Sequence, residues 1–224
     1  MLIRINIQSV LAEEGKAISR LKREWYAGAA YHVMSRGNRQ GIIYREEEDY
    51  LIFLHLLKRV CAEFNVKLDC YCLMTNHFHM IIQTQEFEIW KFMKKLLECY
   101  AKYFNSKYDF KGHLFEKRYT SCLIEDDIYL LEASRYIHLN PVKAHMVREP
   151  LDYAYSSYKK YMQPEEKDTI DETELDLRQS RILGCFKCNQ REQYRMFVEG
   201  KISHFDKEIM IQKQMGEDEN WLPW

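Results

Sequence analysis

Two histidines separated by one residue are the feature of this sequence with the clearest chemistry. They lie in the run Asn76-His77-Phe78-His79. On a β-strand alternate side chains share a face, so His77 and His79 would project together while Phe78 points to the opposite side. Two neutral imidazoles side by side can bind a divalent metal. The spacing alone leaves two interpretations open, a pair of metal ligands or two unrelated strand histidines.

A tyrosine and an asparagine four residues apart form the second such feature. Tyr136 and Asn140 would lie on one face of a helix. The amide oxygen of Asn140 could complete a metal site begun by the two histidines, with the phenol of Tyr136 one helical turn away. On spacing alone the structural alternative is favoured, which is a buried tyrosine followed by a helix that ends at Asn140-Pro141.

The elements that must position these residues follow from the hydrophobic pattern. Apolar residues at helical spacing predict helices over 47–64, 88–105 and 126–138. Residues 30–35 read as a strand, residues 66–73 and 78–84 as an antiparallel hairpin, and residues 114–124 as a strand or extended segment. The order strand, helix, strand, strand, helix, strand, helix predicts an α+β fold with an antiparallel sheet. Asn140-Pro141 should end or kink the third helix.

Five motifs occur in a fixed order between residues 27 and 161. They are Tyr31-His32-Val33 with Ser35-Arg36-Gly37-Asn38, Cys72-Leu73-Met74-Thr75-Asn76-His77-Phe78-His79, Gly112-His113-Leu114-Phe115 with Arg118-Tyr119, Tyr136-Ile137-His138-Leu139-Asn140-Pro141-Val142-Lys143-Ala144, and Ser156-Ser157-Tyr158. Together they resemble the HUH-type single-tyrosine transposases of the IS200-like superfamily, and most closely the REP-associated tyrosine transposases.

The resemblance implies both a fold and a site. The implied fold is a ferredoxin-like antiparallel sheet with helices on one face, followed here by a helical C-terminal extension. The implied site has Tyr136 as nucleophile and His77, His79 and Asn140 as ligands of a divalent metal. The insertion-sequence branch often has Gln at the last of these positions, and Asn matches the REP-associated branch. Nitrogen and oxygen ligands with open positions suit Mg²⁺ or Mn²⁺.

The implied reaction is cleavage and rejoining of single-stranded DNA, at repeats that form hairpins. A 5′-phosphotyrosine and a free 3′-hydroxyl would result, and a later 3′-hydroxyl could reverse the step without ATP. Relatives act as monomers or as homodimers, so both assemblies stay open. Two other functions stay open as well: a single-stranded DNA- or RNA-binding protein that no longer cleaves, and a metal-dependent hydrolase that uses His77 and His79 to activate water.

Contacts with DNA are expected from basic residues near the motifs. Between residues 91 and 122 there are eight basic and three acidic residues, interleaved with aromatic ones. Such a mixture suits single-stranded DNA, although a lysine-rich helix face is also typical of a merely solvated surface. The candidates that adjoin the motifs are Arg36, Arg39, Lys117 and Arg118.

Composition limits the remaining possibilities. The 224 residues include 33 basic and 34 acidic ones, a net charge of −1, which excludes binding to nucleic acid through bulk charge. We expect no membrane span and no secretory signal, and seven scattered cysteines suggest reduced thiols in the cytoplasm. The expected organisation is an N-terminal extension (1–26), a catalytic domain (27–162), an acidic linker (163–176) and a helical C-terminal extension (177–224).

Overall fold

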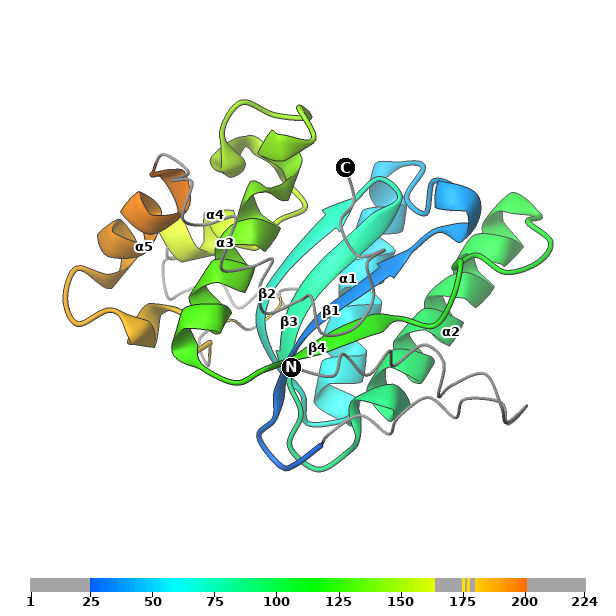
Figure 1. Ribbon diagram of the computed structural model, residues 1–224. Helices are drawn as coiled ribbons and strands as arrows, with labels where there is room; N and C mark the ends of the chain where they lie inside the picture. Colours follow the sequence, from blue (N-terminus) through cyan, green and yellow to red (C-terminus); the bar gives the residue numbers. More distant parts are fainter. Residues whose placement is uncertain (1–24, 164–174, 176, 178–179, 201–224) are drawn as a thin grey trace, which may run out of the picture.

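The computed structural model describes residues 25–163, 175, 177 and 180–200 (Figure 1). Nearly all of the expected N-terminal extension, most of the acidic linker and residues 201–224 of the C-terminal extension lie outside the described residues. None of the helices in the described part of the chain is long and apolar enough to cross a membrane.

A four-stranded antiparallel sheet forms the centre of the molecule. Its strands are β1 (Ala30–Arg36), β2 (Lys67–Met74), β3 (His77–Gln83) and β4 (Thr120–Ile124). They lie in the order β2-β3-β1-β4, with each neighbouring pair antiparallel. β2 and β3 form a hairpin, as the sequence predicted. The structure therefore confirms the predicted α+β class and its antiparallel sheet.

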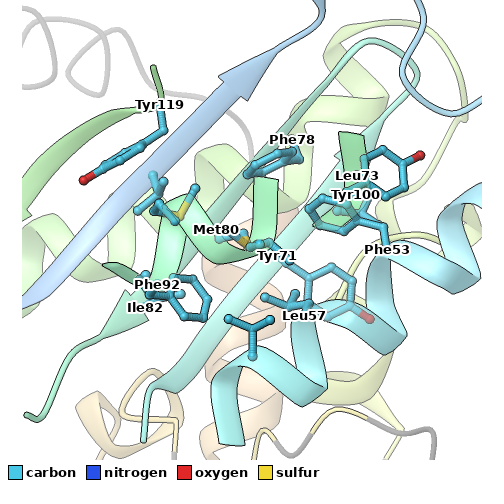
Figure 2. Close-up of a cluster of buried hydrophobic side chains, with 14 of the residues drawn as sticks. Phe53, Leu57, Tyr71, Leu73, Phe78, Met80, Ile82, Phe92, Tyr100 and Tyr119 are labelled. Atoms are coloured by element: carbon cyan, nitrogen blue, oxygen red, sulfur yellow. The ribbon is translucent and has the colours of Figure 1, made fainter. Parts of the chain in front are cut away.

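Two long helices cover one face of the sheet. They are α1 (Glu47–Glu63) and α2 (Ile89–Tyr108). α1 starts at a capping box between Glu46 and Asp49, which satisfies backbone N–H groups at its first turn. Figure 2 shows the core between the helices and the sheet, whose labelled members are Phe53, Leu57, Tyr71, Leu73, Phe78, Met80, Ile82, Phe92, Tyr100 and Tyr119.

The opposite face of the sheet is covered by α3 (Asp127–Lys143), with α4 (Tyr158–Met162) and α5 (Gln190–Glu199) beyond it (Figure 1). The resemblance implied helices on one face of the sheet. That describes α1 and α2, whereas α3 lies on the other face. β2 has apolar residues on both sides, which alternate along the strand between the two cores. A strand that is apolar on both sides needs a layer on each face.

The helix that carries Tyr136 is longer than predicted. Asp126 caps its start by accepting a hydrogen bond from the Tyr129 backbone N–H at 2.7 Å. α3 then runs through Pro141 to Lys143, so the expected end at Asn140-Pro141 is wrong. Proline lacks a backbone N–H and so removes one helical hydrogen bond, to the carbonyl four residues earlier. Only Val142 and Lys143 of α3 follow Pro141.

A buried chain of hydrogen bonds holds α3 against β2 and α5. His138 Nε2 lies 2.8 Å from Ser157 Oγ, and His138 Nδ1 lies 2.7 Å from the Tyr194 hydroxyl. Tyr194 donates to Ser134 Oγ at 3.0 Å, and the Tyr71 backbone N–H donates to Ser157 Oγ at 2.9 Å. Burial lowers the pKa of His138 to about 3, so this ring is neutral and can donate through one nitrogen while accepting through the other.

Three short 3-10 turns complete the described elements. They are η2 (Asn38–Gln40), η3 (Pro150–Asp152) and η4 (Leu183–Cys185). η2 follows β1 directly and lies at the end of the sheet where His77 begins β3. This turn therefore borders the histidine pair.

Candidate active site

β3 carries the two histidines on the sheet face that α3 covers. His77 lies opposite Arg36 of β1, and His79 lies opposite Met34. Phe78, between them, belongs to the core under α1 and α2. Both histidines are buried, and their ring centroids are 5.2 Å apart. The alternation along the strand therefore brings the two imidazoles side by side.

The Nδ1 atoms of both rings are engaged, whereas the Nε2 atoms are not. His77 Nδ1 lies 2.7 Å from Asn76 Oδ1, so the ring donates there. His79 Nδ1 lies 3.1 Å from His32 Nε2. Both Nε2 atoms are buried, and neither makes a hydrogen bond of ordinary geometry to any described residue. A buried polar atom without a partner is costly, and a metal ion would satisfy both of them.

Burial also fixes the charge of these rings. It lowers the pKa of His77 to about 4, with a further contribution from the nearby Arg36 charge. It lowers the pKa of His79 well below its ordinary value, and electrostatic interactions with His32, His77 and Arg36 lower it further. Both rings are therefore neutral at neutral pH, the form that ligates metals.

His32 was not selected as a ligand from the sequence, although its strand position allowed it to approach the site. The structure places it in β1, fully buried, with its ring centroid 5.2 Å from that of His79. Its Nε2 holds His79 Nδ1 and so orients the other nitrogen of that ring. Outer partners of this kind set the tautomer and direction of a metal-ligating histidine.

α3 places Tyr136 and Asn140 over the histidines. The Tyr136 ring meets the His79 ring edge-on, with 5.4 Å between centroids and 86° between planes. Burial raises the pKa of the phenol, while a hydrogen bond from Asn140 and the charge of Arg36 oppose that rise. The same Asn140 side chain acts on His77, where it raises the pKa. The four residues that the sequence singled out therefore converge.

Two cations border the phenol. Arg36 leaves β1 beside His77, and its charge lowers the pKa of Tyr136, of His77 and of His79. Its Nε is buried without a hydrogen-bond partner among the described residues. Lys143 Nζ lies 5.0 Å from the centre of the Tyr136 ring. Lys143 was missed as a site residue, although its position seven residues after Tyr136 on the same helix face could have indicated it.

The other three basic candidates lie on the surface at the end of β1. Arg39, Lys117 and Arg118 are exposed. Backbone hydrogen bonds join the two segments that carry them, from Asn38 N to Leu114 O at 2.8 Å and from Glu116 N to Arg36 O at 3.0 Å. The fold thus gathers these cations at the end of the sheet where the histidines lie, and their contact with DNA stays a prediction.

The side chains around His77 and His79 suit a hard divalent cation only if an amide oxygen is one of the ligands. No group of three or more His, Cys, Asp or Glu side chains in the described part of the chain could hold a metal. A third protein ligand must therefore be a different kind of residue, and Asn140 supplies an amide oxygen beside His77. Two imidazoles and an oxygen leave positions open for a substrate.

A family model described as "Transposase IS200 like" matches residues 26–140, just over half of the chain. This match spans both histidines, Tyr136 and Asn140. The chain belongs to the IS200-like transposase family. A search of curated proteins found no match.

One solved structure agrees with this assignment at the level of the fold. A REP-associated tyrosine transposase bound to a REP hairpin is 18% identical, with a TM-score of 0.53, and the match covers 64% of this chain and 84% of that one. A candidate transposase from Deinococcus radiodurans R1 is 17% identical, with a TM-score of 0.37 and coverage of 50% and 91%. The tRNA(His) guanylyltransferase of Saccharomyces cerevisiae is 11% identical, with a TM-score of 0.35 and coverage of 88% and 82%. Only the first of these likenesses is close enough to show that this IS200-like transposase shares a fold with its neighbour.

Proposed function

We propose that this chain is a metal-dependent DNA transesterase that cleaves and rejoins single-stranded DNA at hairpin-forming repeats through a 5′-phosphotyrosine intermediate. One observation carries the proposal. The Tyr136 ring lies 5.4 Å from the His79 ring, beside two buried histidine Nε2 atoms that make no hydrogen bond of ordinary geometry to any described residue. Membership of the IS200-like transposase family supports a reaction on DNA. The solved neighbour bound to a REP hairpin supports a hairpin as the substrate.

His77, His79 and Asn140 would hold Mg²⁺ or Mn²⁺. When bound, the metal would polarise a phosphate oxygen and offset the negative charge that develops on it. The neutral state of the two histidines favours this role, because a protonated imidazole cannot ligate. His32 fixes the orientation of His79 through the hydrogen bond between their rings.

Tyr136 is the nucleophile in this proposal. Its Oη forms a bond with the phosphorus while the bond from phosphorus to the 3′-oxygen breaks. The phenol loses one proton and the leaving 3′-oxygen gains one, so the step is neutral overall. Because burial raises the pKa of Tyr136, the nearby cations matter, and the Arg36 charge favours the phenolate. The buried Nε of Arg36 has no hydrogen-bond partner in the described part of the chain, so Arg36 is also suited to hold a phosphate oxygen.

A single chain contains all of these groups. Tyr136 lies beside the histidines of its own sheet, so a monomer suffices for cleavage in this proposal, and a homodimer is the other assembly. Arg39, Lys117 and Arg118 would contact the DNA backbone at the exposed end of β1. Their charges would position the strand without reading its sequence.

The proposal is tested by looking for a covalent protein–DNA adduct. A pool of 3′-labelled hairpin oligonucleotides with randomised single-stranded flanks is incubated with the protein and Mn²⁺ and then separated under denaturing conditions. The wild type should form an adduct, and Tyr136→Phe should form none while it still binds the DNA in a native gel. Tyr129→Phe, on the same helix, should keep the adduct, and His77→Ala should lose it.

The same experiment separates the alternatives. Binding by the wild type without any adduct would contradict the proposal and identify a non-cleaving binding protein. Cleavage that persists in Tyr136→Phe would also contradict it, since water would then be the nucleophile and the protein would be a metal-dependent hydrolase.

A further inference from the structure

A cavity of about 310 Å³ adjoins the histidine pair. His77 forms part of its wall, so the cavity is continuous with the candidate active site. It lies where η2, the turn between β2 and β3, and the C-terminal end of α3 meet. Its volume is at the lower end of small-molecule sites, which span about 300–1,000 Å³. A cavity of that size fits one planar ring system and is too small for a segment of several nucleotides.

Most of the wall is apolar. Ile42, Met74, Ala144 and Met146 line it. Two of these side chains are exposed at the rim, Ile42 at 53% and Met146 at 42%. Flexible, polarizable methionines adapt to the flat face of an inserted ring. A phosphate or a sugar would gain nothing from such a surface, whereas a nucleobase that leaves its stack would regain apolar contact.

One amide at the rim is available to recognise the edge of a ring. The Asn76 amide, which also lines the cavity, is already engaged, since it donates to Gln40 O at 3.1 Å and accepts from His77 Nδ1. Gln40 lines the cavity too, and no described residue hydrogen-bonds with its side chain. An amide offers one acceptor and two donors, which can pair with a base edge.

The backbone of η2 holds Gln40 in this place. Arg39 and Gln40 both have positive φ angles, of 53° and 59°. Such a turn requires a close approach of its ends: a Cβ added at Gly37 would lie 2.1 Å from the Gly41 carbonyl oxygen. Gln40 N also donates to Gly37 O at 3.0 Å. The turn therefore fixes the backbone from which the Gln40 amide reaches the cavity.

We infer that this cavity binds one unstacked nucleobase of the substrate strand, from a nucleotide that adjoins the phosphate held at His77 and His79. This inference deepens the proposed function and rests on it for the position of that phosphate. Ile42, Met74 and Met146 would contact the faces of the base, and Gln40 would contact its edge. The cavity would thus discriminate between bases at the position next to the cleavage site. Contacts with phosphate cannot do so, because the phosphate is the same for every base.

A cross-linking experiment tests the inference without relying on cleavage. Tyr136→Phe is mixed with hairpin oligonucleotides that carry 4-thiothymidine at one flanking position at a time, then irradiated and digested for mass spectrometry. We expect one position to cross-link to peptides that contain Ile42, Met74 or Met146. Cross-links confined to other peptides would overturn the inference, whether or not the wild type forms an adduct.

A kinetic experiment tests the energetic role of the cavity once the cleavage position is known. The wild type should form the adduct about tenfold faster with an intact base at the cross-linked position than with an abasic site there, the scale of one stacked base. Met146→Trp, which fills the cavity, should reduce that ratio to about one, and Gln40→Ala should change the preferred base. Met196→Trp, an exposed methionine of α5, is the matched control and should keep the ratio.

The outcomes of the two experiments are separable. An absent adduct together with cross-links at the cavity would reject the proposed reaction and keep the base site. An adduct whose rate is the same with an intact base and with an abasic site at every flanking position would reject the base site and keep the reaction.

Discussion

Burial decides the chemistry of the individual residues at this site. The sequence placed His77 and His79 on one strand face, because the alternation of a strand is fixed by its backbone. It could not place His32 beside them, since that contact depends on the register between β1 and β3, which pairs His32 with Ile81. For the same reason Arg36 was predicted as a DNA contact, and only the pairing of Arg36 with His77 reveals its effect on the phenol.

Removing the Arg36 charge should shift the pH dependence of the reaction. Burial raises the pKa of Tyr136, and the guanidinium opposes that rise. In Arg36→Gln the pKa of the phenol should therefore increase, so the rate of adduct formation at neutral pH should fall by about tenfold, the equivalent of one pKa unit. The pH at which the rate reaches half of its maximum should increase. Quenched time courses between pH 6 and 10 measure both quantities.

Arg36→Lys and Arg39→Gln serve as the comparisons. Arg36→Lys keeps a positive charge and should keep most of the wild-type pH profile. Arg39→Gln removes an exposed charge that is not among the causes of the shift in the pKa of Tyr136. An unchanged profile in Arg36→Gln would show that the guanidinium does not act on the phenol.

At the scale of the element, α3 combines two roles on two faces. Tyr136, Asn140 and Lys143 lie on the face toward the histidines, and His138 lies in the buried hydrogen-bond chain with α5. The helical period allowed the sequence to place Tyr136 and Asn140 together. It gave no partner for His138, because Ser157 and Tyr194 come from segments 19 and 56 residues away.

The docking of α5 should be measurable as stability. Tyr194→Phe removes the hydroxyl that joins His138 to Ser134 and leaves both without that buried partner. We expect the free energy of unfolding to fall by about 1–3 kcal/mol, as for other buried groups that lose a hydrogen bond. Urea denaturation followed by circular dichroism measures the change.

Met196→Ala is the control on the same helix, because Met196 is exposed and should be close to neutral. Equal stability of Tyr194→Phe and the wild type would mean that the hydrogen-bond chain contributes nothing to the docking of α5.

The segment before β4 shows where sequence patterns lose resolution. Residues 114–124 were predicted as one strand or extended segment, whereas β4 spans only Thr120–Ile124. Phe115 instead makes an isolated antiparallel bridge with Gly37. Both parts are extended, so local propensity cannot separate them. The break between them follows from the turn after β1, and the position of that turn relative to this segment depends on the tertiary structure.

At the scale of the whole molecule, the sheet lies between two layers and encloses neutral histidines. His32, His77, His79 and His138 are all buried. The sequence predicted the α1 and α2 layer from two amphipathic helices. It did not predict that α3 covers the other face, because the resemblance implied helices on one face only. The apolar residues of β2 indicate that both faces are buried, but they do not identify the helix that each face contacts.

These histidines should make the protein sensitive to acid. Burial lowers the pKa of His32 and of His77 to about 4, and that of His138 to about 3. In the unfolded chain each pKa returns to about 6.5. The stability that depends on the neutral rings is therefore fully present above pH 6.5 and is lost as pH falls toward the folded values. Each such histidine should lower the free energy of unfolding by about 1 kcal/mol per pH unit in that window.

Urea titrations at pH 7 and pH 5, with a chelator to remove metal, measure the loss. His55→Gln, at an exposed histidine of α1, should leave the difference between the two pH values unchanged. Equal unfolding free energies at pH 7 and pH 5 would contradict the assignment of neutral buried rings.

In the proposed reaction Tyr136 is the residue that becomes covalently linked to the DNA. The most direct measurement is tandem mass spectrometry of the adduct after digestion by a nuclease and trypsin. We expect a nucleotide linked through its 5′-phosphate to Tyr136 and to no other residue. A nucleotide on a different residue, or a linkage through a 3′-phosphate, would contradict it.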